Sequence, residues 1–554
     1  MKLKLFVLLL LIIIVVMPSD AQTPGTSHMP PVNQAIPHIS NHLNVTTNLP
    51  VKKSMPAVSE ARIQDYFPLS EAVIYTDTKE YKVVNITANM LADDIERVTG
   101  KHPRVVKTTS LKNIPKGGAV AVTFLPTSKV KQKQFFRNLN KYYIIMKLSN
   151  KFIVIIGILT MMTMPCKAQK WEHLADTPQM GWSTWNKFQG NISEDIIKGI
   201  ADVMVETGLR DAGYTYINID DCWHGKRDAD GFIQADPIKF PNGIKAVADY
   251  VHSKGLKLGI YSDAGSATCA GRPGSLGHEY QDAIQYARWG VDYLKYDWCN
   301  TTNVNPQGAY QLISDALRSA GRPIFLSMCE WGNSQPWKWA REIGHSWRTT
   351  PDIWCHFDSL RVFPGYTQFG VMQCIQFNDS LRQYAGKGYW NDPDMLEVGN
   401  GMTENEDRAH FTMWCMMASP LILGNDLRNM SEATRNIIMN KEMIAINQDT
   451  LGIQGLHYCD RDGLQFWFKP LAGGDWAFTI LNPTQNNIVC ELNWQDFNFI
   501  DSQVSKMSTA FNTNIYKVYN LWTHKMEGKT NLKNKIVRKV TVKSRDVVSY
   551  RLIK

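Results

Sequence analysis

One pattern constrains the fold more than any other, and it recurs eight times between residues 179 and 455: a short apolar strand ends in polar residues, and a helical segment follows it. "EDIIKGIADVMVETGLRDAG" is typical of these helical segments, with apolar residues at helical spacing and a closing glycine. Eight units over about 280 residues predict an α/β fold, a (β/α)8 TIM barrel spanning 170–455. The strand ends are QMGWSTWN (179–186), YTYINIDDCW (214–223), KLGIYSDAG (257–265), YLKYDWCN (293–300), IFLSMCEWG (324–332), SWRTTPDI (346–353), YWNDPDML (389–396) and PLILGNDL (420–427).

The pattern changes near Leu456 to alternating strands separated by turn signals, as in "GLQFWFKPLAGGDWAFTILNPT". Apolar and polar residues alternate with period two, which indicates half-buried antiparallel strands. We therefore expect a C-terminal antiparallel β-sandwich domain over 456–554.

Two segments before the barrel have the organisation of a secretory signal peptide. Residues 1–22 have a basic start, an apolar run and a small-residue break, and residues 146–169 ("MKLSNKFIVIIGILTMMTMPCKAQ") repeat that order. The second apolar run is shorter than the roughly 20 residues that cross a bilayer, so no stable membrane span is expected. We interpret the chain as two joined reading frames, the functional one beginning near Met146. The product is expected to be exported, to the periplasm or the extracellular space.

The residues between these two segments divide into a linker and a fragment. Residues 23–65, rich in Pro, Ser, Thr and Asn, suit a flexible linker. Residues 66–145 predict a partial α+β domain, with a strand, a second strand and a helix that Gly100 stops. Residues 70–125 resemble the first part of the N-terminal domain of glycoside hydrolase family 115 enzymes, without any catalytic motif.

Charge and cysteine content exclude two classes of function. Residues 1–168 carry 21 Lys and Arg against 9 Asp and Glu, so of the net charge of +9 the remaining residues carry −3. Nucleic-acid binding by the barrel is therefore not expected. The ten cysteines form no CxxC pair and no metal-ligand spacing, so a zinc site is not expected. We expect no cofactor.

Acidic residues gather where the strands end, which is where barrels of this type build active sites. The candidates are Asp220, Asp221, Asp263, Asp297, Glu330, Asp352, Asp392 and Asp394. Two carboxyl groups that face each other across a sugar are the minimum needed to hydrolyse a glycosidic bond. Lys295 and Asp297 face the same way along their strand, and the cation favours the ionised carboxylate that a nucleophile requires. A buried ion pair that only braces the barrel is the alternative.

The other acids are harder to rank from spacing. Asp220 and Asp221 are adjacent, and the repulsion between their carboxylates costs stability unless hydrogen bonds offset it. Hydroxyl groups of a bound sugar could supply those hydrogen bonds. A helix cap or a loop brace would also explain either residue. Asp352 follows Arg348 and a proline on an irregular segment that could reach over a sugar. Asp392 or Asp394 could be the general acid in place of Asp352. Alternatively, these two acids could orient Arg348 and Lys295 without touching the sugar. Trp185 and Tyr261 are the aromatic residues best placed to contact a sugar.

Eight of these motifs, in order, resemble glycoside hydrolase family 27, the retaining α-galactosidases or melibiases. They are MGWSTWN, IDDCW, GIYSDAG, LKYDWCN, CEWG, WNDPDML, SPLILGNDLR and INQD, and the similarity covers about residues 171–554. The resemblance implies a barrel with a C-terminal β-domain, no metal, and hydrolysis by double displacement of terminal non-reducing α-D-galactosyl residues from oligosaccharides or polysaccharides.

The resemblance also assigns roles to residues. It implies that Asp297 is the nucleophile and Asp352 the acid/base. It implies that Cys269 and Cys299 form a disulfide, whereas Cys222 and Cys329 lack their usual partners and are expected to be free. The substrate-binding residues that it implies are Trp185, Asp220, Asp221, Tyr261, Lys295, Glu330, Trp331, Arg348 and Asp394.

Three alternatives stay open at this point. The family also contains α-N-acetylgalactosaminidases, which place smaller residues in the loop that here reads CEWG, and β-L-arabinopyranosidases, which would need bulk where Asp220 and Asp221 stand. A non-catalytic carbohydrate-binding barrel would be expected to have lost Asp297 or Asp352. Residues 355–388 depart from the family pattern and are expected to shape the leaving-group side.

Overall fold

The computed structural model describes residues 73–77, 102, 104–108, 119–122, 170–530 and 538–554. The chain divides into two compact units, Met1–Met164 and Pro165–Lys554. The expected signal peptide, linker and internal signal segment all lie outside the described residues. No helix among the described residues is long and apolar enough to span a bilayer.

Three parallel strands are described in the first unit, and β1 lies between the other two. β1 is the first strand expected in this region, whereas the expected second strand and helix fall in residues 78–101, outside the described residues. The three strands are β1 (Val73–Asp77), β2 (Arg104–Thr108) and β3 (Ala119–Val122).

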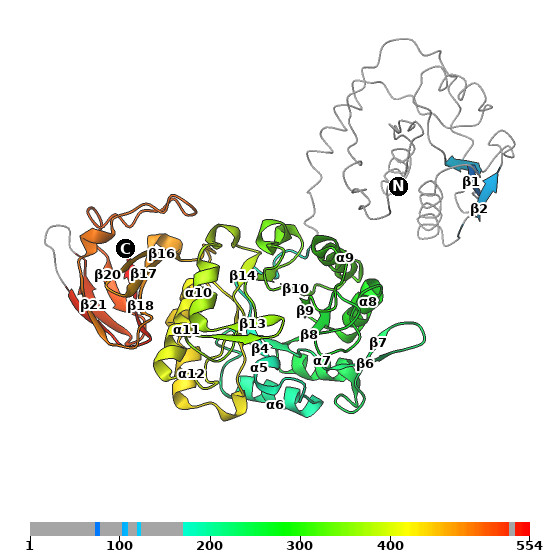
Figure 1. Ribbon diagram of the computed structural model, residues 1–554, viewed down its shortest axis with the longest axis horizontal. Helices are drawn as coiled ribbons and strands as arrows, with labels where there is room; N and C mark the ends of the chain where they lie inside the picture. The colour runs from blue at the N-terminus through cyan, green and yellow to red at the C-terminus, as the bar shows by residue number, and fades with distance from the viewer. Residues whose placement is uncertain (1–72, 78–101, 103, 109–118, 123–169, 531–537) are drawn as a thin grey trace, which may run out of the picture. The chain divides into compact units, whose positions relative to one another are not determined.

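The second unit begins with an eight-stranded parallel sheet of order β14-β11-β10-β9-β8-β5-β4-β15 (Figure 1). Leu396, just after β14, donates its N–H to Ile422 O of β15 at 2.8 Å and accepts from Gly424 N at 3.0 Å. These bonds join the two ends of the sheet, so the predicted barrel is confirmed, and its strands lie within the eight predicted strand ends. They are β4 (Met180–Ser183), β5 (Tyr216–Asn218), β8 (Lys257–Asp263), β9 (Tyr293–Asp297), β10 (Phe325–Cys329), β11 (Ser346–Arg348), β14 (Trp390–Asp392) and β15 (Leu421–Leu423).

Amphipathic helices cover the outside of the barrel. In α6 the residues Ile197, Ile200 and Met204 are buried at helical spacing, and the Ser193 side chain caps the helix by accepting from Ile196 N. The helix expected after β10 is replaced by two single turns of 3-10 helix, η4 (Pro336–Lys338) and η5 (Ala340–Glu342). The α-helices are α5 (Trp185–Phe188), α6 (Glu194–Glu206), α7 (Gly243–Ser253), α8 (Glu279–Trp289), α9 (Pro306–Ser319), α10 (Val371–Asp379), α11 (Glu404–Met416), α12 (Glu432–Ile438) and α13 (Lys441–Asn447).

Aromatic side chains close one end of the barrel interior. Tyr216, Tyr293, Phe325 and Trp390 are the first residues of β5, β9, β10 and β14, and they form one buried cluster. The Tyr293 and Phe325 rings stack with their centroids 4.9 Å apart. Because parallel strands all start at the same end, this apolar layer seals the bottom of the barrel, and a ligand can enter only where the strands finish.

An antiparallel β-domain follows the barrel, as predicted. Its six-stranded sheet has the order β16-β17-β18-β23-β20-β21, and β19 pairs with β22. Buried aromatic residues, including Phe466, Phe468 and Phe478, fill its core, and the buried Arg382–Asp501 ion pair ties it to the barrel. The strands are β16 (Leu456–Arg461), β17 (Leu464–Pro470), β18 (Trp476–Asn482), β19 (Ile488–Leu492), β20 (Lys517–Asn520), β21 (Lys525–Lys529), β22 (Arg538–Val542) and β23 (Asp546–Ile553).

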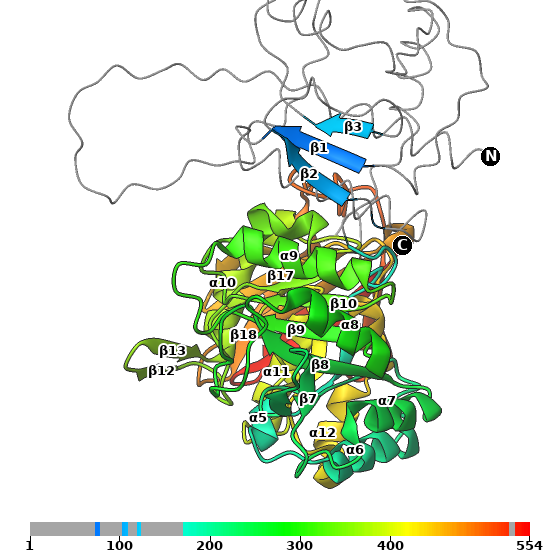
Figure 2. The same ribbon diagram turned by 90° about the vertical axis from the view of Figure 1, so that its right-hand side faces the viewer.

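Two hairpins interrupt the barrel repeat. One is β6 (His224–Arg227) with β7 (Ile233–Ala235), after β5. The other is β12 (Leu360–Phe363) with β13 (Tyr366–Phe369), after β11. The second hairpin projects from the body of the barrel (Figure 2) and lies within residues 355–388, the segment that departs from the family pattern.

Candidate active site

A cavity of about 350 Å³ opens at the end of the barrel where the strands finish. Every catalytic or substrate-binding residue expected from the sequence lines it, apart from Glu330. These lining residues are Trp185, Asp220, Asp221, Tyr261, Lys295, Asp297, Trp331, Arg348, Asp352 and Asp394. They come from seven strand ends and are brought together by the shared direction of the strands.

Asp297 ends β9 and is 5% exposed. Its Oδ1 accepts a hydrogen bond from Trp298 N at 2.9 Å, and its Oδ2 lies 3.6 Å from Cys269 Sγ. Burial raises the pKa of Asp297 to about 6, the Lys295 ammonium opposes that rise, and the Asp352 and Asp220 carboxylates add to it. The carboxylate is therefore largely buried, fixed at one oxygen and ionised at neutral pH, as an attacking carboxylate needs to be.

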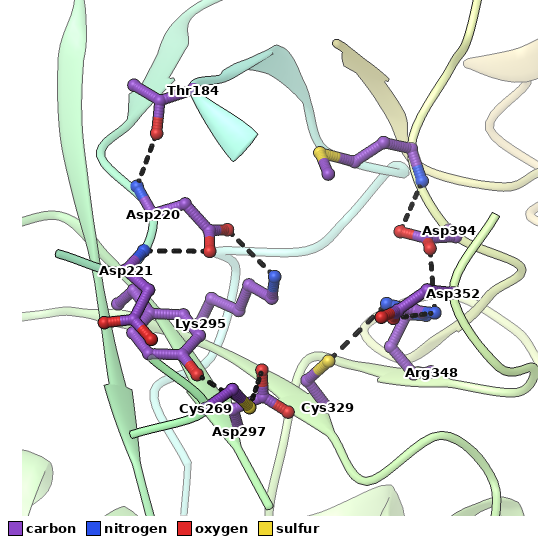
Figure 3. A network of polar contacts seen from close by, with 12 residues as sticks. Thr184, Asp220, Asp221, Cys269, Lys295, Asp297, Cys329, Arg348, Asp352 and Asp394 are labelled. Carbon is purple, nitrogen blue, oxygen red and sulfur yellow. Dashed lines mark hydrogen bonds and ion pairs between the residues drawn. The ribbon is translucent and has the colours of Figure 1, made fainter. Parts of the chain in front are cut away.

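Lys295 and Asp220 form the polar wall beside Asp297. Lys295 Nζ donates to Asp220 Oδ2 at 2.8 Å, so the direct ion-pair partner of Lys295 is Asp220 rather than Asp297. Asp220 N donates to Thr184 Oγ1, and Asp221 N donates to Asp220 Oδ1, each at 2.9 Å (Figure 3). This wall presents both an ammonium and carboxylate oxygens to the cavity, a combination that suits sugar hydroxyls because each can donate and accept.

Asp221 shows how two adjacent acids are accommodated. Its Oδ1 accepts from Cys222 N at 2.6 Å, and its Oδ2 accepts from Ala270 N at 2.9 Å. Burial raises the pKa of Asp221, and these backbone donors oppose the rise. Asp221 thus braces the loop after β8 while it lines the cavity, which matches the loop-brace alternative as well as the binding one.

Arg348 organises the side of the cavity that carries Asp352. Its Nη2 contacts Asp394 Oδ2 at 2.8 Å and Asp352 Oδ1 at 3.1 Å, and it donates to Thr350 O at 3.1 Å. Asp394 Oδ2 also accepts from Ile353 N at 2.8 Å. Asp394 therefore fixes both Arg348 and the backbone that follows Asp352, whose side chain is 42% exposed. Figure 3 shows this group across the opening from Asp220.

Three of the eight candidate acids lie outside the cavity lining: Asp263, Asp392 and Glu330. Asp392 Oδ1 accepts from Asp394 N at 2.9 Å, and burial raises its pKa to about 6. Glu330 is fully buried, and its Oε2 accepts from Ser334 N at 2.6 Å. This places Glu330 behind the turn on which Trp331 lines the cavity, so supporting that turn fits its position better than direct contact with a sugar.

The expected disulfide between Cys269 and Cys299 is present and joins the loops after β8 and β9. Cys222 and Cys329 are free and buried, as expected. Asp263 accepts hydrogen bonds from Gly265 N and Cys299 N, and burial raises its pKa to about 8. Within the described residues, Asp263 and the two bridged cysteines are the only cluster of potential metal ligands, and sulfurs joined in a disulfide are not thiolate ligands.

The aromatic residues near the strand ends fall into two groups, those that line the cavity and those buried in the barrel core. Tyr261 lines the cavity, and the Lys295 ammonium lies 5.3 Å from the centroid of its ring. Trp185 also lines the cavity, whereas Trp182 and Trp223 are fully buried in the barrel core. The cavity thus combines aromatic rings with fixed charges, the usual composition of a sugar site.

Several lining residues were not predicted from the sequence. Asn186 and Asn400 both donate to the Glu397 carboxylate, and burial raises the pKa of Glu397 to about 7. Asn186 follows Trp185 directly and Glu397 follows the WNDPDML motif, so their closeness to the strand ends was the available signal. The remaining ones are Lys187, Gln189, Cys269, Ile353, Trp354, Cys355, Arg361, Gln368 and Met395.

Comparison with known proteins shows which family the chain belongs to. The family model described as "Alpha galactosidase A" matches residues 177–449, and the model described as "Alpha galactosidase C-terminal beta sandwich domain" matches residues 461–552. An "Alpha-galactosidase A" from Cellvibrio japonicus is 52% identical over 392 residues, covering 71% of this chain and 96% of that protein.

Solved structures agree as well. The α-galactosidase I of Mortierella vinacea is 37% identical with a TM-score of 0.63, covering 69% of this chain and 98% of that one. An α-galactosidase of Saccharomyces cerevisiae solved with raffinose is 33% identical with a TM-score of 0.63, covering 68% and 98%. The chain therefore belongs to glycoside hydrolase family 27, the family of the α-galactosidases.

Proposed function

We propose that the protein is an exported, retaining exo-α-galactosidase that hydrolyses terminal α-D-galactosyl residues of oligosaccharides or polysaccharides. Asp297 attacks the anomeric carbon while Asp352 gives its proton to the departing glycosidic oxygen, which leaves galactose covalently bound to Asp297. Asp352 then takes a proton from water, and the resulting nucleophile releases galactose from Asp297. Two inversions at one carbon retain the α configuration.

The observation that carries this proposal is the contrast between the two carboxylates on one cavity. Asp297 is buried and lies beside the Lys295–Asp220 pair, whereas Asp352 is partly exposed and is held by Arg348. Asp297 is therefore positioned to attack the sugar from inside the barrel, and Asp352 can exchange protons with solvent.

The remaining groups take the roles of sugar ligands. Asp220, Asp221 and Lys295 bind the O4 and O6 end of galactose, and Arg348 and Trp331 face the remainder of the ring. Trp185 and Tyr261 supply apolar surface for its C–H face. No metal or cofactor is needed in this scheme, since the charge that develops on the sugar is balanced by Asp297.

Release of galactose from a nitrophenyl α-galactoside tests the proposal. The panel includes the matching α-N-acetylgalactosaminide and β-L-arabinopyranoside, and the α-galactoside is expected to be the best substrate. Folded protein that binds galactose and cleaves nothing would instead be a carbohydrate-binding barrel. If the protein prefers the α-N-acetylgalactosaminide or the β-L-arabinopyranoside, its activity is the hydrolysis of that glycoside instead.

The pH dependence of kcat/KM should have an acid limb near pH 6. Asp297 reacts as the carboxylate, and burial raises its pKa to about 6, so kcat/KM falls as the pH drops through that value. The measurement is a pH series on a nitrophenyl α-galactoside with unliganded enzyme at low substrate. Asp392→Asn is the matched control, because Asp392 has a similarly raised pKa outside the cavity lining, and it should keep the limb. A flat profile down to pH 4 would contradict the assignment.

Export with cleavage of the internal signal segment predicts a mature N-terminus at Gln169 or Lys170. The disulfide is consistent with an oxidising compartment. Lys170 is itself built into the barrel, since its Nζ donates to Gly344 O and Gly388 O at 2.7 Å each, so cleavage just before it leaves the catalytic unit whole. N-terminal sequencing of the native protein is the measurement. Residues 30–140 found covalently attached would contradict the prediction.

A further inference from the structure

The β12–β13 hairpin lies directly beside the acid/base carboxyl group. Phe369 N donates to Asp352 O at 2.8 Å, and Trp354 N donates to Phe369 O at 3.0 Å. Strand β13 is therefore hydrogen-bonded to the backbone on both sides of Ile353. Because Asp352 protonates the leaving oxygen in the proposed mechanism, whatever the hairpin presents to the cavity faces the leaving group.

The register of the hairpin decides which side chains it presents. Arg361 pairs with Gln368, and Phe363 pairs with Tyr366, across a two-residue connection. Directly paired residues lie on the same face of a hairpin, and so do residues two apart on one strand. Arg361, Phe363, Tyr366 and Gln368 therefore share one face, which we call the hairpin face.

The near end of the hairpin face belongs to the cavity. Arg361 and Gln368 both line it, and their paired Cβ atoms lie about 5 Å apart. Among the described residues neither side chain makes a hydrogen bond or an ion pair, although the Arg361 guanidinium lies 4.7 Å from the Phe363 ring centroid. By contrast, Lys295, Arg348 and Asp394 deeper in the cavity are all bound to protein groups.

The far end of the hairpin face is aromatic. The Phe363 and Tyr366 rings stack with their centroids 4.5 Å apart, and Tyr366 is 54% exposed. This pair lies two residues along from Arg361 and Gln368, or about 7 Å. The hairpin face therefore carries polar donors and, about 7 Å further along, an exposed ring. This arrangement matches successive sugar units, because the donors can bind the hydroxyl groups of one unit and the ring can stack on the C–H face of the next.

We propose that the hairpin face is a binding strip for a saccharide leaving group, with Arg361 and Gln368 holding the first sugar after the scissile bond and Tyr366 the next. The inference rests on the proposed α-galactosidase activity and deepens it by naming the residues that hold the saccharide on the leaving-group side of the scissile bond. Lys187 and Gln189 also line the cavity.

The test compares substrates whose leaving groups lengthen: nitrophenol, then one, two and three neutral sugar units attached to the same α-galactosyl group. Arg361→Ala should lower kcat/KM on the one-sugar substrate about tenfold more than on the nitrophenyl galactoside, mainly through KM, because a charged donor to a hydroxyl is lost. Tyr366→Ala should begin to lower kcat/KM only with the two-sugar leaving group.

Val362→Ala is the matched control, since Val362 lies on the other face of the same strand and is 73% exposed; it should change none of the four rates. A loss for Arg361→Ala on the saccharide substrates that appears in kcat with KM unchanged would mean that Arg361 only supports proton transfer by Asp352, and would overturn the inference. Equal losses on all four substrates would overturn it as well. The absence of any dependence on length in either variant would also overturn it. Wild-type protein that cleaves none of the four substrates would refute the proposed activity itself.

Discussion

Asp297→Asn should lower kcat on an α-galactoside by on the order of 10⁴-fold or more, because an amide cannot attack the anomeric carbon and no covalent intermediate forms. The other acids cannot substitute for it: Asp220 is committed to Lys295, and Asp394 to Arg348 and Ile353 N. Turnover is measured on the nitrophenyl galactoside and on an oligosaccharide.

Binding should survive this substitution. The variant removes a charge and keeps the shape, and its amide oxygen can still accept from Trp298 N, so calorimetry should still detect galactose. Asp392→Asn provides the matched control, since it is a buried acid with a similar pKa that does not line the cavity, and it should lose far less activity. Turnover of Asp297→Asn close to wild type would remove Asp297 from the mechanism.

Asp352→Ala should lower kcat/KM on an oligosaccharide by about 10² to 10⁴-fold, the usual contribution of a general acid. A nitrophenolate leaves without protonation, so the variant should still form the galactosyl-enzyme from the nitrophenyl galactoside. Hydrolysis of that intermediate, which needs a base to activate water, then becomes rate-limiting. Added azide needs no base, and it should restore turnover and give galactosyl azide with the α configuration.

Asp352→Asn is the matched variant, since it keeps the side-chain shape and loses only the proton transfer. Arg348 should stay in place in both variants, because Asp394 Oδ2 still contacts it at 2.8 Å. Equal losses on the oligosaccharide and the nitrophenyl substrate, with no response to azide, would show that Asp352 has another role.

The barrel could be predicted from the sequence because its strands carry two signals at once. Each strand is short and apolar, and each finishes in residues such as Asp297 or Arg348 that an apolar core would not tolerate unpaired. The ends of parallel strands in a barrel meet at one rim, so predicting the strands also predicted most of the residues that line the cavity. Choosing Asp352 over Asp392 and Asp394 needed the family resemblance, because the three acids look alike in spacing.

What the sequence could not predict depends on side-chain direction and on irregular backbone. Glu330 and Trp331 are neighbours, yet the turn at Trp331, where φ is 56°, sends one into the cavity and leaves the other behind it. Lys295 shares a strand face with Asp297, but its ammonium group bonds to Asp220, just after β5. No local sequence pattern encodes how close those two chain segments lie. The hairpin face around Arg361 depends on a register that only the folded chain reveals.

The most direct test of the account is to trap and locate the covalent intermediate. A 5-fluoro-α-galactosyl fluoride slows the release step, because the ring fluorine destabilises the cationic transition state, so that galactosylated enzyme accumulates. Mass spectrometry of digested protein should find one sugar on the peptide that carries Asp297, and none in Asp297→Asn. A label on Asp352 or on any other residue, or β-galactose as the first product without a covalent species, would contradict the account.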